Sequence, residues 1–248
     1  MELSVMSPVL AAMSLEDSLA YLKKLGVDSF EIGAGGYPGK AHLDPKDYLG
    51  KPEKIEELKA LLKKYDMKIS AVACHGNPVH PNREIAKKFH EEFVDAMKIA
   101  VLLGTDTIIG FSGCPGDCED SKNPNWVTCA WPPEYLDILE WQWEKIIIPY
   151  WKETAALAKE IGIKKIAFEM HPGFCVYNPS RSFVCVPLSV ISSARMWTPA
   201  TSSGRASILA KRSKCWKAPS ITSTQRTPRS MVPTPKRSAF WIRKAMLT

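Results

Sequence analysis

The sequence predicts an α/β fold of parallel strands, and we expect a (β/α)8 barrel of which about five βα units are present. Strand-like and helix-like segments alternate along residues 1–179 at intervals of roughly thirty to forty residues. Polar and glycine-rich residues follow directly after the expected strands, where a barrel carries its active site. No G-x-G-x-x-G or G-x-x-x-x-G-K-[ST] motif follows a strand, which argues against an open, nucleotide-binding sheet.

The first two βα units set the pattern. An apolar run at residues 3–6 is the first strand, and Ser14, with an acid three residues later, caps a helix that stops at Gly26. The second strand, 29–32, ends in a glycine-rich stretch. Helix 52–65 has aliphatic side chains on one face and lysines and glutamates on the other, which predicts packing on a core.

The later elements repeat this alternation. In order they are strand 68–73, a long helix 82–103, strand 107–111, a largely helical segment 134–161 and strand 165–169. Pro149 lies inside the segment 134–161, where its missing N–H and its ring conflict with a continuous helix. We therefore expect Pro149 to kink or divide that helix.

Three residues at strand ends are candidates for chemistry. Glu169 ends the fifth strand, where a carboxylate can bind a divalent metal or move a proton, although a solvated acid would fit the position equally well. His171 follows it in the same segment, and we assign it to substrate binding. His75 and His80 lie in the loop after the third strand, and loop histidines are more often structural than ligands.

The cysteines and tryptophans give weaker signals. Seven unevenly spaced cysteines predict reduced thiols and a cytoplasmic protein, and Cys114, Cys118 and Cys129 do not have the spacing of a metal clip. The N-terminus lacks a basic signal-peptide region, and we find no apolar run long enough for a membrane span. Five tryptophans are expected to be packing, with one or two able to wall a sugar site: Trp126, Trp131, Trp141, Trp143 and Trp151.

Four segments carry a family resemblance: FEIGAGGYPGKAH, VACHGNPVHP, IIGFSGCPGD and IAFEMHPGFCVYNP. They resemble the sugar phosphate isomerase/epimerase family of xylose-isomerase-like TIM barrels, over residues 1–179. The resemblance implies that Glu169 is a metal ligand and often an acid/base residue, that His75 lines the sugar site, and that the cation is Mn²⁺, Mg²⁺ or Co²⁺. It implies a small sugar or sugar phosphate as the partner. It also implies later ligands in D-P-S-H and H-x-K-D segments and a late Glu, none of which is present.

The C-terminal tail, residues 180–248, differs from the rest of the chain. It has thirteen Lys and Arg and no Asp or Glu, whereas residues 1–179 have 20 Lys and Arg and 26 Asp and Glu. A basic, Ser- and Thr-rich tail is typical of disordered segments that bind nucleic acid. The genetic code offers a different interpretation. With one choice of codons, TPATSSGRASI at 198–208 becomes DPSHLFWQGID when reading begins one nucleotide earlier.

Two further tail segments behave in the same way. Residues 218–230 can yield AIYHFHAKDTEI, and residues 232–244 can yield a GPNT…GVLDTK sequence. Three family segments then appear in the correct order. We therefore predict that residues 1–179 are the N-terminal part of the barrel, that 180–248 are an out-of-frame translation of its second half that packs poorly, and that the barrel is open after the fifth strand.

The function expected from the resemblance is a metal-dependent sugar or sugar-phosphate isomerase or epimerase. This chain is expected to be inactive and to hold no metal stably, because the later ligands are missing. One alternative is another enzyme of the same barrel superfamily, an inosose-type dehydratase or an apurinic endonuclease. The other is a non-enzymatic protein whose basic tail contacts nucleic acid, which we consider less favoured.

Overall fold

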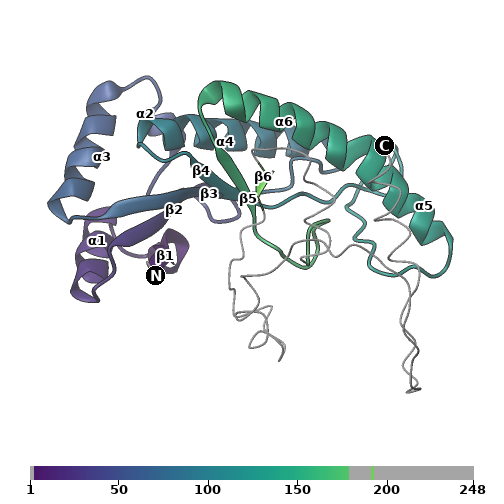
Figure 1. The fold of residues 1–248 in the computed structure, drawn as a ribbon, viewed down its shortest axis with the longest axis horizontal. Helices are drawn as coiled ribbons and strands as arrows, with labels where there is room; N and C mark the ends of the chain where they lie inside the picture. The colour runs from purple at the N-terminus through teal and green to yellow at the C-terminus, as the bar shows by residue number, and fades with distance from the viewer. Residues whose placement is uncertain (1–2, 179–190, 193–248) are drawn as a thin grey trace, which may run out of the picture. The chain divides into compact units, whose positions relative to one another are not determined.

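A single parallel sheet organises the protein. The computed structural model describes residues 3–178 and the backbone of residues 191–192. Its strands follow the order of the sequence, β1-β2-β3-β4-β5-β6, and each pairs in parallel with the next (Figure 1). Their bounds are β1 Ser4–Met6, β2 Ser29–Gly36, β3 Lys68–His75, β4 Thr107–Gly110, β5 Lys165–Phe168 and β6 Ile191–Ser192. A strand order that never reverses is that of a barrel rather than of a doubly wound sheet, as predicted.

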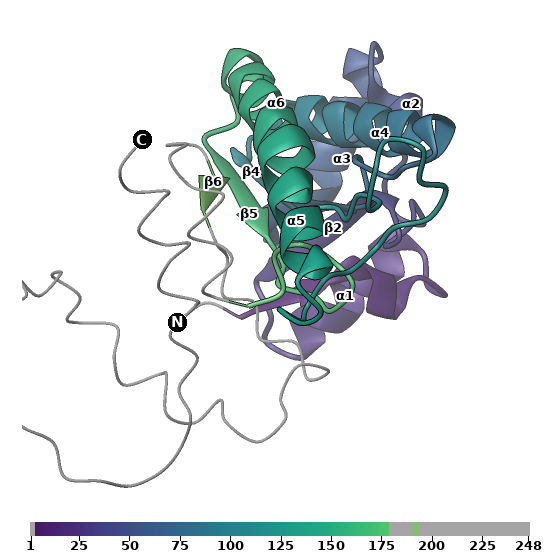
Figure 2. The ribbon, with the colours of Figure 1, turned by 90° about the vertical axis from the view of Figure 1, so that its right-hand side faces the viewer.

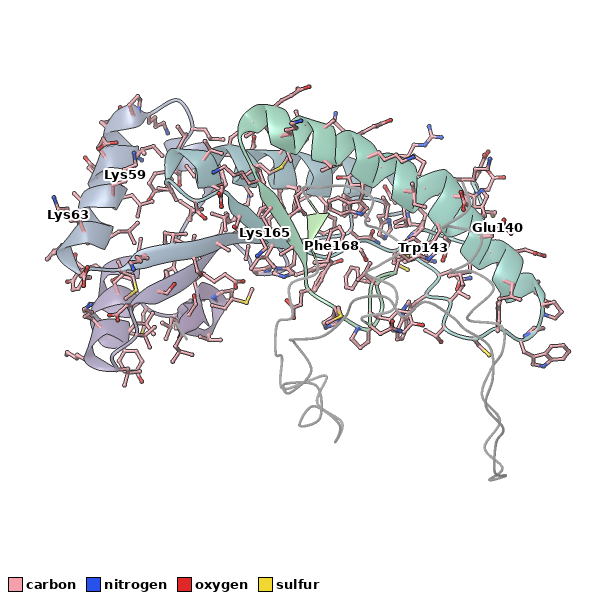
Figure 3. All side chains as sticks on the ribbon, viewed as in Figure 1. Lys59, Lys63, Glu140, Trp143, Lys165 and Phe168 are labelled. Carbon is pink, nitrogen blue, oxygen red and sulfur yellow. The ribbon has the colours of Figure 1, made fainter. Side chains whose placement is uncertain are left out.

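The helices return the chain between these strands. Their bounds are α1 Leu15–Lys24, α2 Pro45–Tyr48, α3 Pro52–Lys64, α4 Arg83–Leu102, α5 Glu134–Trp141 and α6 Ile148–Ile161, with a 3-10 turn at Ser7–Leu10. Figure 2 shows α5 and α6 running alongside β4 and β5 on the side of the sheet where α4 also lies. On α3, Ile55, Leu58 and Leu62 are buried, whereas Lys63 projects away from the sheet (Figure 3), as the amphipathic pattern predicts.

Side chains alternate between two faces of the sheet. The outward face joins the helices in one large core, which includes Phe30, Ile32, Val72, Ile108, Ile166 and Phe168. The inward face carries a small second cluster of Ala71, Ile109 and Ala167. Because successive residues of a strand alternate, His75 follows Ala71 on the inward face of β3 and Glu169 follows Ala167 at the end of β5. The inward face therefore contains the predicted site.

The long segment 134–161 is divided, as Pro149 predicts. Helix α5 passes into a π-helical stretch, Gln142–Ile147, before α6 begins with Pro149 in its first turn. A proline ring cannot fit against the carbonyl four residues earlier in a regular α-helix, and a widened turn relieves that conflict. Trp143 and Trp151, from the π-helical stretch and α6, are both buried in the main core.

The structure corrects one expectation of the sequence analysis and adds one strand to it. Strand β3 continues to His75, so His75 ends a strand instead of lying in the loop that follows. In addition, Ile191–Ser192 pairs in parallel with Ile166 and Ala167, which adds a two-residue strand to an incomplete barrel. A two-residue strand is too short to produce a recognisable alternation. The other expectations about residues 180–248 fall outside the described residues.

Among the described residues, no helix combines the length and the apolar character that crossing a bilayer requires.

Candidate functional site

Glu169 and His75 meet at the carboxyl ends of their strands. Their side chains reach across the position of β4, and Nε2 of His75 lies 2.9 Å from Oε2 of Glu169. His75 is 1% exposed and Glu169 is 7% exposed. The Glu169 backbone N–H donates to the carbonyl oxygen of Gly110 at 3.0 Å, which fixes the end of β5 against β4. The two side chains therefore face the same space.

The contact between the two groups is short but is not a well-directed hydrogen bond. In the described residues, neither ring nitrogen of His75 has a partner in hydrogen-bond geometry. The two polar atoms are therefore 2.9 Å apart and buried, and both ring nitrogens of His75 remain without a hydrogen bond. Buried polar groups in proteins are nearly always satisfied, and those that are not cluster at functional sites. The pair has the character of a binding or catalytic site.

Glu31 is a second buried carboxylate that the sequence analysis missed. It lies on the inward face of β2, paired in register with Ala71, and is 8% exposed. Its Oε1 has no hydrogen-bond partner among the described residues. Burial, and then the charge of Glu169, raise the pKa of Glu31 to about 7. The signal available in the sequence is an acid inside the apolar run FEIG, two residues before the inward-facing Gly33.

Aromatic rings form one wall of the site. Phe111 stacks on Phe174 with ring centroids 4.1 Å apart, and the edge of His75 meets Phe111 at 4.5 Å. The His171 ring lies 5.1 Å from that of Phe111, so His171 and His75 contact the same side chain. Tyr37 extends the wall beyond Phe174. Flat rings of this kind pack on the apolar faces of sugars.

The remaining sequence candidates do not join this site. The Nδ1 atom of His80 accepts a hydrogen bond from the backbone N–H of Asn82 at 2.9 Å, at the start of α4, and burial lowers its pKa. His80 is therefore structural. Trp151 is buried and donates to the Ser112 carbonyl oxygen at 2.8 Å. Trp143 is also buried, whereas Trp126 and Trp131 are exposed, so the expected packing role is seen for Trp143 and Trp151. No disulfide joins the five cysteines of the described residues.

The ends of β2 and β3 are held close together beside the site. The Gly36 N–H donates to Oε2 of Glu92 at 2.8 Å, and the Tyr37 N–H donates to the His75 carbonyl oxygen at 2.7 Å. Gly36 has a φ of +67°, and a Cβ there would lie 1.8 Å from that carbonyl oxygen. Only glycine fits this position, so Gly36 sets how closely the Tyr37 loop approaches His75.

The described residues do not make a complete metal site. Residues 3–178 contain no group of three or more His, Cys, Asp or Glu side chains that could hold an ion. Glu169 and His75 offer two converging donors, whereas Mg²⁺ and Mn²⁺ prefer octahedral, oxygen-rich sites. The buried pair with unsatisfied nitrogens is compatible with part of such a site, but it does not amount to one.

A separate cavity of about 330 Å³ lies among α1, α2 and α3. Leu15, His42, Tyr48 and Leu58 contribute to its lining, together with Ala41 and further residues of α3. It contains none of the residues predicted from the strand ends. We therefore assign the site to the strand ends and not to this cavity.

Comparison with known proteins finds matches over the same part of the chain. The family model described as "Xylose isomerase-like TIM barrel" matches residues 19–183. The uncharacterized protein YfiH of Bacillus subtilis is 39% identical over 186 residues, which are 74% of this chain and 59% of YfiH.

Two crystal structures illustrate the shared fold. The probable 3-DHS dehydratase AsbF of Bacillus anthracis has a TM-score of 0.51 at 14% identity, over 78% of this chain and 62% of that one. A putative xylose isomerase of Rhodospirillum rubrum has a TM-score of 0.54 at 13% identity, over 78% of this chain and 64% of that one. The chain thus spans about three fifths of the length of these relatives.

Proposed function

Because the chain belongs to the xylose isomerase-like TIM barrel family, we propose that it derives from a metal-dependent sugar or sugar-phosphate isomerase or epimerase. The observation that carries this proposal is the buried pair of His75 and Glu169, 2.9 Å apart at the carboxyl ends of β3 and β5. These strand ends are where barrels of this type carry their active sites. Glu169 is proposed as the acid/base residue and as a metal ligand.

The side chains of the site suit proton transfer on a sugar. Isomerisation and epimerisation can both begin by removing a proton from the carbon beside the sugar's carbonyl group. Isomerisation returns the proton to the neighbouring carbon, and epimerisation returns it to the opposite face of the same carbon. The Glu169 carboxylate is proposed to exchange that proton with the substrate, and His75, 2.9 Å from it, to bind a substrate hydroxyl beside the carboxylate. The stacked rings of Phe111 and Phe174, with His171 beside them, would support the apolar face of the sugar and exclude water.

A divalent cation belongs to the proposal for the intact protein. Mn²⁺, Mg²⁺ or Co²⁺ would polarise the substrate carbonyl or hydroxyl there. The described residues supply too few ligands for it, so this chain is proposed to bind the cation weakly and to be inactive.

We propose that the metal ligands are missing because the C-terminal tail is translated in the wrong reading frame. Residues 180–248 lack every acid, and their codons can encode the missing D-P-S-H and H-x-K-D segments in another frame. The family match supports this reading, because it ends at residue 183, a few residues beyond the proposed shift near Pro179.

Frame restoration tests the proposal. One nucleotide is inserted, or two are deleted, near the Pro179 codon so that the D-P-S-H frame is read. The restored protein should exchange solvent deuterium into the carbon-bound position of a ketose from a panel of free and phosphorylated sugars. Glu169→Gln should abolish that exchange, whereas Glu53→Gln on the exposed face of α3 should not affect it.

Two results would contradict the proposal. If the restored protein releases water from its substrate and forms an unsaturated product, it is a dehydratase of the same superfamily. If the restored protein is inactive and the present chain binds DNA with an affinity that falls steeply with salt, the basic tail is functional as it stands.

A further inference from the structure

Two buried cysteines from different loops lie side by side near the site. Cys114 follows β4 and Cys175 follows β5, and their side chains share a hydrogen bond. They are 1% and 6% exposed, respectively. The Cys175 N–H donates to the carbonyl oxygen of Gly113 at 3.0 Å, which brings the two backbones together at the residue before Cys114.

The pairing of these loops does not depend on the thiols. The Asn77 side chain donates to the Cys114 carbonyl oxygen at 2.8 Å and accepts from the Cys114 N–H at 2.9 Å. On the other loop, the Val176 N–H donates to the Ser112 hydroxyl at 2.9 Å. Both loops are therefore anchored by buried hydrogen bonds that do not involve the sulfur atoms.

We propose that Cys114 and Cys175 form a reversible redox-modification site, in which a low-molecular-weight disulfide such as glutathione disulfide oxidises them to an intramolecular disulfide. The Cys114 thiolate attacks the small disulfide, forms a mixed disulfide and releases one glutathione thiolate. The Cys175 sulfur then attacks the Cys114 sulfur and releases the second. Two S–H bonds are lost and one S–S bond forms, while the small disulfide takes up two electrons and two protons as two thiols.

The local chemistry favours Cys114 as the attacking group. The hydrogen bond from Cys175 lowers the pKa of the Cys114 thiol, and the thiolate is the reactive form. Cys74, which is also buried, differs: burial and the charge of Glu92 raise the pKa of its thiol well above the usual range. Cys74 is therefore expected to stay reduced under the same conditions.

The cross-link would act on the wall of the candidate site. The loop that carries Cys114 begins with Phe111, and the loop that carries Cys175 includes Glu169 and Phe174. A bond between the loops would fix the stacked rings of Phe111 and Phe174 at 4.1 Å. The proposal rests on the thiol geometry alone, so it can hold whether or not the protein is an isomerase.

Peptide mapping of the full-length chain tests the proposal. The folded protein is incubated with glutathione disulfide, quenched in acid, alkylated and digested with trypsin without reduction. The expected product joins peptide 99–122, which holds Cys114 and Cys118, to peptide 166–181, which holds Cys175. Dithiothreitol should separate the peptides, and prior unfolding in urea should replace this product with mixed cross-links.

Substitutions identify the partner cysteine. Cys118→Ser should leave the 99–122/166–181 product unchanged, and Cys114→Ser should remove it. The proposal is overturned if Cys118→Ser removes the product instead, or if Cys175 becomes alkylated at the same rate with and without oxidant. It is also overturned if the folded protein cross-links peptide 166–181 mainly to the peptides of Cys129, Cys185 or Cys215.

Discussion

The carboxyl group of Glu31 should make the stability of the protein depend on pH between about 4.5 and 7. Its pKa rises on folding from an ordinary value of 4.5 to about 7, first through burial and then through the charge of Glu169. A group with a raised pKa binds its proton more tightly in the folded state. Its contribution to stability is therefore complete below pH 4.5 and is lost as the pH rises through 7.

The size of the effect follows from the shift. One pKa unit corresponds to about 1.4 kcal/mol, so the free energy of unfolding should fall by about 3 kcal/mol between pH 4.5 and pH 8 because of Glu31 alone. Glu31→Gln removes the ionisation but keeps a polar group of similar shape. Near pH 4.5 it should change stability little, and at pH 8 it should stabilise the protein by most of that amount.

Urea unfolding measures this difference. The fluorescence of the buried Trp143 and Trp151 reports unfolding, at low protein concentration to limit aggregation. Glu53→Gln, at an exposed position of α3, is the matched control and should follow the parent protein at every pH. If Glu31→Gln and the parent lose stability in parallel from pH 5 to pH 8, the carboxyl is not held in a poorly solvated interior and the argument fails.

Two further substitutions test how the site is supported. Gly36→Ala should destabilise the protein by roughly 2 kcal/mol or more, because its Cβ would overlap the His75 carbonyl oxygen, whereas Gly26→Ala, with a φ of +75° and nothing within 4 Å, should cost only about 1 kcal/mol. Equal losses in urea unfolding would contradict the close approach. Asn77→Ala should cost about 2–4 kcal/mol, because it leaves the N–H and the carbonyl oxygen of Cys114 buried without partners, and exposed Asn123→Ala should cost little. A thermal melt in which both asparagine variants match the parent would refute this role.

Much of the fold could be predicted from the sequence because its signals are local. The spacing of strands and helices, the stop of the first helix at Gly26 and the division near Pro149 all follow from neighbouring residues. Glu169 could be recognised as a candidate site residue because it directly follows an apolar strand. Strand β6 could not be predicted, because two residues carry no periodicity.

The arrangement of the site depended on contacts between distant segments. His75 and Glu169 meet only because β3 and β5 flank β4 in the sheet, and the spacing of residues along the chain does not reveal this. Glu31 was missed because the sequence does not show which face of the sheet an acid in a short apolar strand occupies. The pairing and register of the strand determine that face. The stacking of Phe111 on Phe174 likewise joins two loops that follow different strands.

Metal binding tests the central claim most directly. Titration with Mn²⁺, followed by the loss of the free-ion electron paramagnetic resonance signal, compares the present chain, the frame-restored protein and its Glu169→Gln variant, with Glu53→Gln as the control. The account predicts about one tightly bound ion in the restored protein and in the control, and weak binding in the present chain and in the Glu169→Gln variant. It would be contradicted if the present chain bound Mn²⁺ as tightly as the restored protein, or if the loss of the Glu169 carboxylate left the affinity unchanged.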